Sequence, residues 1–220
     1  MSDSPLIKLN RHTVQHQGVA VLENISLHIH DGEKVALLGA SGAGKSTLLN
    51  AMRQQLCENA AWCPQEGNLV PVLSVFHNIY MGALPRHSTF YNLRNLIFPS
   101  AQQKTAVTEI TDALGLTEKL FTSIDRLSGG QAQRTALGRA LFSNKTTLLA
   151  DEPVSNLDER HGKALLLYAL SRHHSGVVAL HDQQLALDCF DRVIGLKSGT
   201  ILIDAPANQL TLATLQSLYQ

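Results

Sequence analysis

The sequence has no excess of either charge, few aromatic residues and no long apolar run. Its 18 Lys and Arg residues balance 18 Asp and Glu residues, so it lacks the basic field that holds nucleic acid or an anionic membrane surface. The longest apolar runs, residues 35–38 and 164–170, fall far short of the roughly 20 residues that span a bilayer. We therefore expect no nucleic-acid partner, and any membrane role must depend on another subunit.

Cysteine is also scarce. Cys57, Cys63 and Cys189 are odd in number and lack metal-type spacing, which predicts plain thiols. None of the ten histidines forms a closed ligand set with Cys, Asp or Glu along the sequence. Residues 1–5 are polar and show no charged-then-apolar leader, so we expect the chain to stay in the cytoplasm.

The pattern of apolar residues predicts one α/β unit, for which 220 residues can bury a full core. Strands are expected at residues 6–9, 19–29, 34–38, 60–63, 147–150 and 177–180, with a hairpin over 192–196 and 200–203. Helices are expected at residues 45–56, 74–81, 101–114, 131–142, 160–173 and 208–218. The βα alternation after residue 127 predicts a mostly parallel sheet with flanking helices.

We expect residues 1–220 to form a single domain of two parts. Residues 1–66 and 131–220 form its core, and residues 67–130 form an inserted helical subdomain, because prolines and helical spacing replace the strand pattern there.

A glycine-rich run lies between an expected strand and an expected helix and fits the pattern GxxxxGK[ST]. Its residues are Gly39, Ala40, Ser41, Gly42, Ala43, Gly44, Lys45 and Ser46, with Thr47 following. Glycine permits positive φ, so successive backbone N–H groups can face a polyphosphate at a helix N-terminus. Lys45 then reaches the β- and γ-phosphates, and Ser46 offers a hydroxyl to Mg²⁺. The alternative is a turn that binds nothing, and kinases, GTPases and motor ATPases share the pattern.

Two adjacent carboxylates end the expected strand 147–150. Asp151 is placed to hold the Mg²⁺ shell, and Glu152 is placed to polarise the attacking water as general base. The alternative is an acidic cluster favoured by a helix dipole. The glycine loop upstream favours the catalytic interpretation.

A second glycine motif opens the expected helix 131–142. It consists of Leu127, Ser128, Gly129, Gly130 and Gln131. It offers another anion-binding helix N-terminus, and one nucleotide does not need both on one face of a molecule. Together with residues 133–141 and 151–153, this series resembles the ABC-type ATPase domain of ABC transporters, and the order of motifs covers nearly the whole chain.

The resemblance implies an α/β phosphate-loop NTPase fold and roles for three further residues. Gln65 resembles the Q-loop glutamine, with a catalytic and Mg²⁺-linked role, and Asp158 resembles the D-loop aspartate. His181 resembles the switch histidine, although taken alone it is a strand-end histidine with a backbone partner. ATP and Mg²⁺ are the implied cofactors, with Ser46, Gln65 and Asp151 at the metal.

The resemblance also implies partners. Lys45 of one subunit and Ser128 of the other sandwich each ATP in a head-to-tail dimer, expected here as a homodimer. Transmembrane permease subunits and, indirectly, a solute-binding protein complete the assembly at the inner face of the cell membrane.

Three features depart from the family pattern. Only nineteen residues separate Lys45 from Gln65, which predicts a reduced antiparallel β lobe. Residues 13–18 offer no aromatic side chain to stack on adenine, so His16 is the candidate platform, against an exposed turn histidine with no role. Asn156 replaces the small residue common in the D-loop and should leave Asp158 in place.

Five aromatic residues crowd between the Q-loop and the helix expected at 101–114, namely Phe76, Tyr80, Phe90, Tyr91 and Phe98. They indicate a docking groove or the subdomain's own small core, and both can hold.

The run 78–84, followed by residues 88–90, resembles the phosphonate-import ATPases, so we expect import of phosphonate or a related oxyanion. The alternatives are an importer for amino acids or metals, an ATPase of export or lipoprotein release, and a soluble ABC ATPase. A non-ABC phosphate-loop kinase would lack the motif at 127–131.

Overall fold

The computed structural model describes residues 5–219, so residues 1–4 of the N-terminal segment and residue 220 lie outside the described chain. The strands are β1 (Ile7–His16), β2 (Val19–Ile29), β3 (Lys34–Leu38), β4 (Ala60–Cys63), β5 (Thr147–Asp151), β6 (Ser175–Ala179), β7 (Arg192–Lys197) and β8 (Thr200–Pro206). The α-helices are α1 (Lys45–Leu56), α2 (Val75–Tyr80), α3 (Thr89–Ile97), α4 (Ala101–Ala113), α5 (Gly129–Phe142), α6 (Glu159–Ser171), α7 (Gln183–Cys189) and α8 (Leu212–Leu215). Short 3₁₀ turns, among them η2 (Met81–Arg86), connect several of them.

A six-stranded sheet in the order β4-β5-β6-β3-β7-β8 forms the centre of the fold. Neighbouring strands are parallel except β7 and β8, which pair antiparallel as the expected hairpin. The registers Asp151↔Ala179 and Leu37↔Ala179 bring the carboxyl ends of β5, β6 and β3 level with one another. The α/β class is confirmed, and its ligand-binding edge lies where these strands end.

Alternate residues of the strands enter two hydrophobic clusters, one on each face of the sheet. Leu37 packs with Leu48 and Met52 of α1 on one face. Leu38, its neighbour in β3, joins Leu137 of α5 on the other. Burying one such leucine side chain stabilises the fold by about 1.5–3 kcal/mol, so the two faces fix the sheet between helices.

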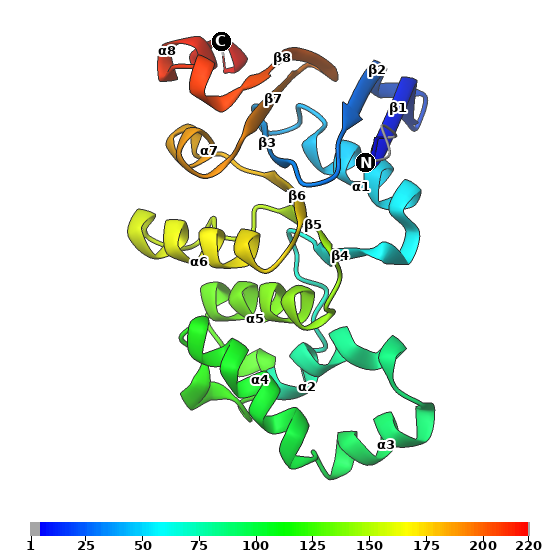
Figure 1. Ribbon diagram of the computed structural model, residues 1–220, viewed down its shortest axis with the longest axis vertical. Coiled ribbons are helices and arrows are strands. Elements are labelled where there is room, and N and C mark those ends of the chain that lie inside the picture. Colours follow the sequence, from blue (N-terminus) through cyan, green and yellow to red (C-terminus); the bar gives the residue numbers. More distant parts are fainter. Residues whose placement is uncertain (1–4, 220) are drawn as a thin grey trace.

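The reduced antiparallel lobe consists of β1 and β2 in the described chain, with pairs running from Ile7↔Ile29 to His16↔Val19. The Lys8 N–H donates to Gln55 Oε1 over 3.1 Å, which attaches β1 to α1. In Figure 1 the pair lies beside α1, with β7 and β8 nearby. The short gap between Lys45 and Gln65 is filled by α1, one short turn and β4.

Helices α2, α3 and α4 gather at the end of the molecule away from β1 and β2, and α5 lies between them and the sheet (Figure 1). Helix α3 lies in the expected helical subdomain, between the two helices that the sequence predicted there, but was not itself predicted. Ser88 caps it by accepting a hydrogen bond from the Tyr91 N–H. The flanking Pro85 and Pro99 gave this stretch the appearance of a loop. None of the helices among residues 5–219 is long and apolar enough to cross a membrane.

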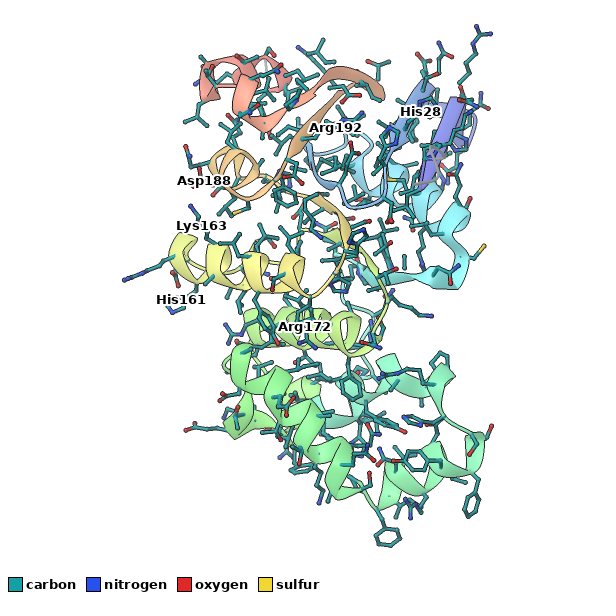
Figure 2. The ribbon with its side chains drawn as sticks, viewed as in Figure 1. His28, His161, Lys163, Arg172, Asp188 and Arg192 are labelled. Carbon is teal, nitrogen blue, oxygen red and sulfur yellow. The ribbon has the colours of Figure 1, made fainter. Side chains whose placement is uncertain are left out.

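Two further differences concern the C-terminal third. The expected helix at 208–218 is wrong in extent, because Leu210 and Thr211 are extended, with ψ of 154° and 161°, and only α8 is α-helical. Helix α7 was not predicted, although Asp182 caps it. An ion pair of 2.5 Å between Lys163 and Asp188, both labelled in Figure 2, joins α6 to α7.

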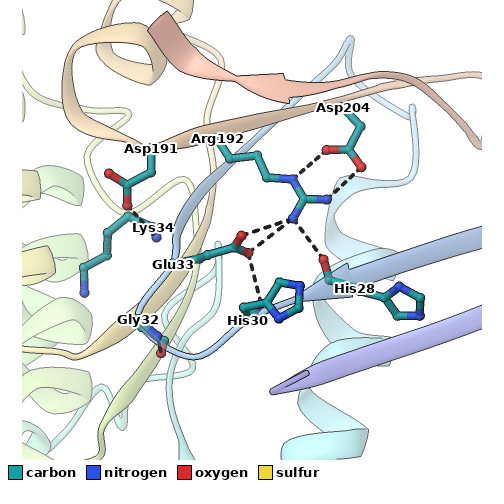
Figure 3. A network of polar contacts seen from close by, with 9 residues as sticks. His28, His30, Gly32, Glu33, Lys34, Asp191, Arg192 and Asp204 are labelled. Atoms are coloured by element: carbon teal, nitrogen blue, oxygen red, sulfur yellow. Dashed lines mark hydrogen bonds and ion pairs between the residues drawn. The ribbon is translucent and has the colours of Figure 1, made fainter. Parts of the chain in front are cut away.

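A polar network centred on Arg192 ties the opposite edge of the sheet together (Figure 3). Its guanidinium donates to both carboxylate oxygens of Asp204 over 2.6 and 2.8 Å, which joins β7 to β8. It also donates to Glu33 over 3.2 Å and to the His28 carbonyl over 2.9 Å. These hydrogen bonds raise the pKa of Arg192. The network lies where β3 and β7 begin, so its role is structural.

Candidate functional site

The topology assembles four of the predicted groups from sequence-distant segments. The glycine loop follows β3, Gln65 follows β4, Asp151 ends β5 with Glu152 next to it, and His181 follows β6. Strands β4, β5, β6 and β3 are neighbours and run parallel, so their carboxyl ends open at one edge. The sheet order therefore brings these groups together.

The glycine loop turns tightly from β3 into α1. Gly39 has φ of 151°, and a Cβ there would lie 2.4 Å from the Leu196 carbonyl oxygen. Gly44 has φ of 102°, and its Cβ would meet Leu22 at 2.7 Å. A side chain at either position would push the loop away from β7 or β2. The buried Lys45 Nζ donates to the carbonyl oxygens of Gly39 (2.8 Å) and Ala40 (3.3 Å), so the ammonium lies within the loop.

Asp151 is buried, with 4% of its surface exposed, and its Oδ1 has no hydrogen-bond partner among residues 5–219. Burial raises the pKa of this carboxyl, and a hydrogen bond from Ser46 opposes the increase. Burial likewise lowers the pKa of Lys45, while the charges of Glu152 and Asp151 raise it. Two buried opposite charges thus influence each other where water is largely excluded, which strengthens their effect on a bound anion or cation.

Glu152 lies at the centre of a second set of contacts. Its Oε1 lies 2.6 Å from His181 Nε2, and its Oε2 accepts a hydrogen bond of 3.4 Å from Gln65 Nε2. Its backbone has φ of 50°, a left-handed conformation that costs a non-glycine residue about 1–2 kcal/mol. Such conformations gather at functional sites, where surrounding contacts maintain them.

The glycine loop, Gln65, Glu152 and His181 enclose a hollow of about 230 Å³. Its lining consists of Val21, Ser41, Gly42, Gly44, Lys45, Ser46, Thr47, Gln65, Glu152 and His181. Val21 was not predicted as a site residue from the sequence. It lines the hollow because β2 brings it close to Gly44. His16 does not line the hollow. It lies exposed where β1 ends, and its stacking on adenine stays a prediction.

The signature residues begin α5 and do not line this hollow. The Ser128 hydroxyl accepts from the Gln131 N–H over 3.3 Å, and the Gln131 side chain accepts from the Ser128 N–H over 3.0 Å. This capping box fixes the start of α5. Ser128 and Gly129 are exposed, so within one chain their surface faces solvent.

Asp158 caps α6 next to the hollow. Its Oδ1 accepts from the His161 N–H (3.1 Å) and its Oδ2 lies 2.7 Å from His161 Nδ1, contacts that lower the pKa of Asp158. His161 points away from α6 in Figure 2. Asp158, Glu152 and His181 line a second hollow of about 280 Å³ that adjoins the first. The structure therefore places the predicted D-loop aspartate next to the predicted base.

A magnesium ion suits the oxygen donors at this edge. Within the described part of the chain, the Asp151 Oδ1 has no hydrogen-bond partner, and Ser46 lies within hydrogen-bonding distance of the same carboxyl. Mg²⁺ prefers oxygen ligands and is commonly held by one or two protein groups plus substrate phosphates. Residues 5–219 contain no cluster of three His, Cys, Asp or Glu residues, which a metal bound by protein alone would need.

Comparison with known proteins identifies the family. The family described as ABC transporter matches residues 22–60 and 52–155. A protein of Polaromonas sp. named phosphonates import ATP-binding protein PhnC is 35% identical over 97% of this chain and 88% of its own length. The chain belongs to the ABC transporter family. A protein of the same name from Pseudomonas entomophila is 36% identical over 97% of the cassette and 91% of its own length.

A solved structure described as a dimeric post-hydrolysis state of an ATP-binding cassette bound to ADP and Pi has the same fold. It is 26% identical, with a TM-score of 0.73, and the alignment covers 91% of this cassette and 98% of that chain. The cassette is therefore an ATP-binding ATPase, and its glycine loop and Asp151–Glu152 pair lie where β3 and β5 end.

Proposed function

We propose that this cassette is the ATP-hydrolysing subunit of an importer for phosphonate or a related oxyanion. The observation that carries the proposal is the 35–36% identity, over 97% of the chain, to relatives named for phosphonates import. The run 78–84 supports it, because this run, followed by residues 88–90, resembles the phosphonate-import ATPases.

The geometry supports a division of roles at the hollow. The loop N–H groups and Lys45 bind the β- and γ-phosphates of ATP. Glu152 accepts a proton from the water that attacks the γ-phosphorus, and the bond to the departing ADP breaks. His181, 2.6 Å from Glu152, and Gln65 hold this carboxylate in place.

We assign the metal position to Ser46, Asp151 and Gln65. When bound there, Mg²⁺ neutralises charge on the phosphates. Asp151 supplies the anionic oxygen and Ser46 the hydroxyl, while Gln65 lies across the hollow at Glu152.

A second copy of the cassette completes the site in this proposal. Ser128 and Gly129 are exposed at the start of α5, where a phosphate of the partner's ATP can accept hydrogen bonds from the Ser128 hydroxyl and the Gly129 N–H. Asp158 lies at the edge of the adjoining hollow and faces the same interface. In this proposal, residues 1–66 and 131–220 form the core of the domain, and residues 67–130 form the inserted helical subdomain.

The permease docks at an apolar groove between α2 and α3, of about 320 Å³. Its lining consists of Leu73, His77, Tyr80, Met81, Leu84, Thr89, Asn92, Leu93 and Leu96. The two interpretations of the aromatic cluster both have support here, because Phe76 is fully buried whereas Phe90 is 80% exposed beside the groove. Docking at this groove places the cassette on the cytoplasmic face of the membrane, with the solute-binding protein on the other side.

An uptake assay tests the proposed substrate class. Cells that carry the chain together with a phosphonate permease and its solute-binding protein should accumulate radiolabelled methylphosphonate, and Lys45→Ala in this chain should reduce accumulation to background. Excess phosphonate should compete, and amino acids should not. Unchanged uptake in Lys45→Ala cells contradicts the proposal, as does competition by an amino acid alone.

Co-purification tests the groove. Leu93→Asp places a charge on α3 where the leucine is 58% exposed, and it should remove the permease from the purified cassette while ATP binding persists. Leu167→Asp is the matched control, because Leu167 on α6 is 45% exposed and lies outside the groove. Permease retained by Leu93→Asp, or lost equally from both variants, refutes the docking site.

A further inference from the structure

Gln133, on the second turn of α5, reaches across to the loop after β5. Its Nε2 donates to the Glu152 carbonyl oxygen and, over 3.0 Å, to Ser155 Oγ. Its Oε1 accepts from both the backbone N–H (3.3 Å) and the side-chain amide (3.1 Å) of Asn156. A glutamine amide has two donor hydrogens and two acceptor lone pairs. The hydrogen-bonding capacity of the Gln133 amide is therefore fully used by the loop after β5.

These bonds act on a residue with an unfavourable backbone. Glu152 has φ of 50°, and its N–H donates to the Ala179 carbonyl over 3.0 Å. Its own carbonyl accepts from Gln133 and also from the N–H (3.4 Å) and hydroxyl (3.3 Å) of Ser155, which Gln133 contacts as well. The bond to Ala179 belongs to the sheet, whereas the bond from Gln133 comes from α5. Rotation about the Glu152 backbone moves its carboxylate relative to His181, so the aim of that carboxylate depends on both bonds.

Helix α5 contacts both loops that surround the hollow. Near its start, a Cβ on Gly130 would lie 3.4 Å from the Asn156 carbonyl oxygen, so the helix and this loop are in close contact. Further along, the Arg139 guanidinium donates to the carbonyls of Gly67 and Asn68, just beyond Gln65. A shift of α5 is thus transmitted to the segments that carry Gln65 and Glu152.

We propose that Gln133 is a positioning residue that holds the left-handed backbone of Glu152 and makes the aim of its carboxylate depend on the position of α5. The proposal rests on the role of Glu152 as general base. Asn156, the residue that departs from the family pattern, strengthens this connection because its side-chain amide adds a second donor to Gln133 Oε1.

Steady-state ATP hydrolysis by Gln133→Met tests the proposal, because methionine keeps the volume and removes every hydrogen bond of the amide. We expect kcat to fall about tenfold or more, since misplacing a catalytic group by about 1 Å can cost up to a hundredfold. The KM for ATP should stay within about twofold, because the glycine loop is untouched. Calorimetric ATP binding and far-UV circular dichroism confirm that the variant is folded.

Gln103→Met is the matched control. Gln103 on α4 is buried and its side-chain amide is also hydrogen-bonded, but to His87 and Tyr91, away from the hollow. Its kcat should equal that of the unmodified chain. A kcat of Gln133→Met close to the unmodified value overturns the proposal, and so does an equal fall in both variants or a loss of ATP binding in Gln133→Met.

Glu152→Gln, measured in parallel, separates this inference from the one beneath it. Turnover that stops in Glu152→Gln but persists in Gln133→Met removes the positioning role alone. Turnover that persists in Glu152→Gln shows that Glu152 is not the general base, which refutes the proposed function of this residue.

Discussion

Replacing Asp151 by Asn should stabilise the cassette at neutral pH while abolishing its turnover. The carboxyl is 4% exposed, and its Oδ1 has no partner among the described residues. A buried polar atom without a hydrogen bond costs about 1–3 kcal/mol, and more when charged. An amide of the same shape removes the charge but leaves one polar atom without a partner. We therefore expect the free energy of unfolding to rise by about 1–2 kcal/mol at pH 7.

The gain should depend on pH in a defined direction. Burial raises the pKa of Asp151 above its ordinary value of 3.8, so the folded chain binds this proton more tightly than the unfolded chain. The folded state is then penalised as pH rises from 3.8 through the raised pKa, and the penalty is fully present above it. The advantage of Asp151→Asn should be largest at neutral pH and should vanish at pH values below 3.8.

Urea unfolding at several pH values measures this difference. Trp62 is the only tryptophan in the sequence. It lies in β4 and pairs with Leu149 of β5, so its fluorescence reports the unfolding of these two strands. Asp158→Asn is the control, because hydrogen bonds from His161 lower the pKa of Asp158 and its ionised form therefore stabilises the fold above the unfolded pKa. That variant should gain no stability. Equal or lower stability of Asp151→Asn at pH 7 refutes the reasoning.

Two further substitutions test the packing and the polar network. Gly82→Ala puts a Cβ 2.3 Å from the Arg139 carbonyl oxygen, so η2 must move away from α5, and thermal unfolding should show a loss of about 1–3 kcal/mol. Arg192→Lys cannot make the paired hydrogen bonds to Asp204, and should lose about 1–3 kcal/mol in urea unfolding, because these bonds join charged groups. Replacing Lys163, whose ion pair with Asp188 of α7 is more exposed, should cost at most about 1 kcal/mol. An equal loss of stability in the Arg192 and Lys163 variants contradicts the importance assigned to the Arg192 network.

Much of the fold could be predicted because its elements carry strong local patterns. The expected ranges 34–38, 45–56 and 60–63 coincide with β3, α1 and β4, where apolar runs end at glycine or at a clear loop. Helix α3 could not be predicted in this way. Only one of its nine residues, Asn95, is buried, so its apolar residues do not mark a core-facing side. The C-terminal helix was overestimated because apolar spacing alone does not reveal the extended backbone at Leu210 and Thr211.

The candidate site divides in the same way. Its motifs were visible because the glycine loop and the signature each have a pattern of residue types that phosphate binding requires. The partners of Glu152 were not derivable from local sequence, because Gln65 and His181 reach it only through the strand order β4-β5-β6. The contacts of Gln133 were not predictable either, although it belongs to the run 133–141, since its hydrogen bonds depend on how α5 packs against the loop after β5.

We propose that two copies of the cassette enclose ATP and that Glu152 is the general base for its hydrolysis. The most direct measurement is the molar mass of Glu152→Gln with ATP and Mg²⁺, by size-exclusion chromatography with light scattering. The account predicts twice the mass of one chain, with no turnover. It also predicts a return to the single-chain mass, with ATP still bound, when Ser128→Arg is added. A Glu152→Gln chain that stays single with ATP bound, or that hydrolyses ATP at the unmodified rate, contradicts the account.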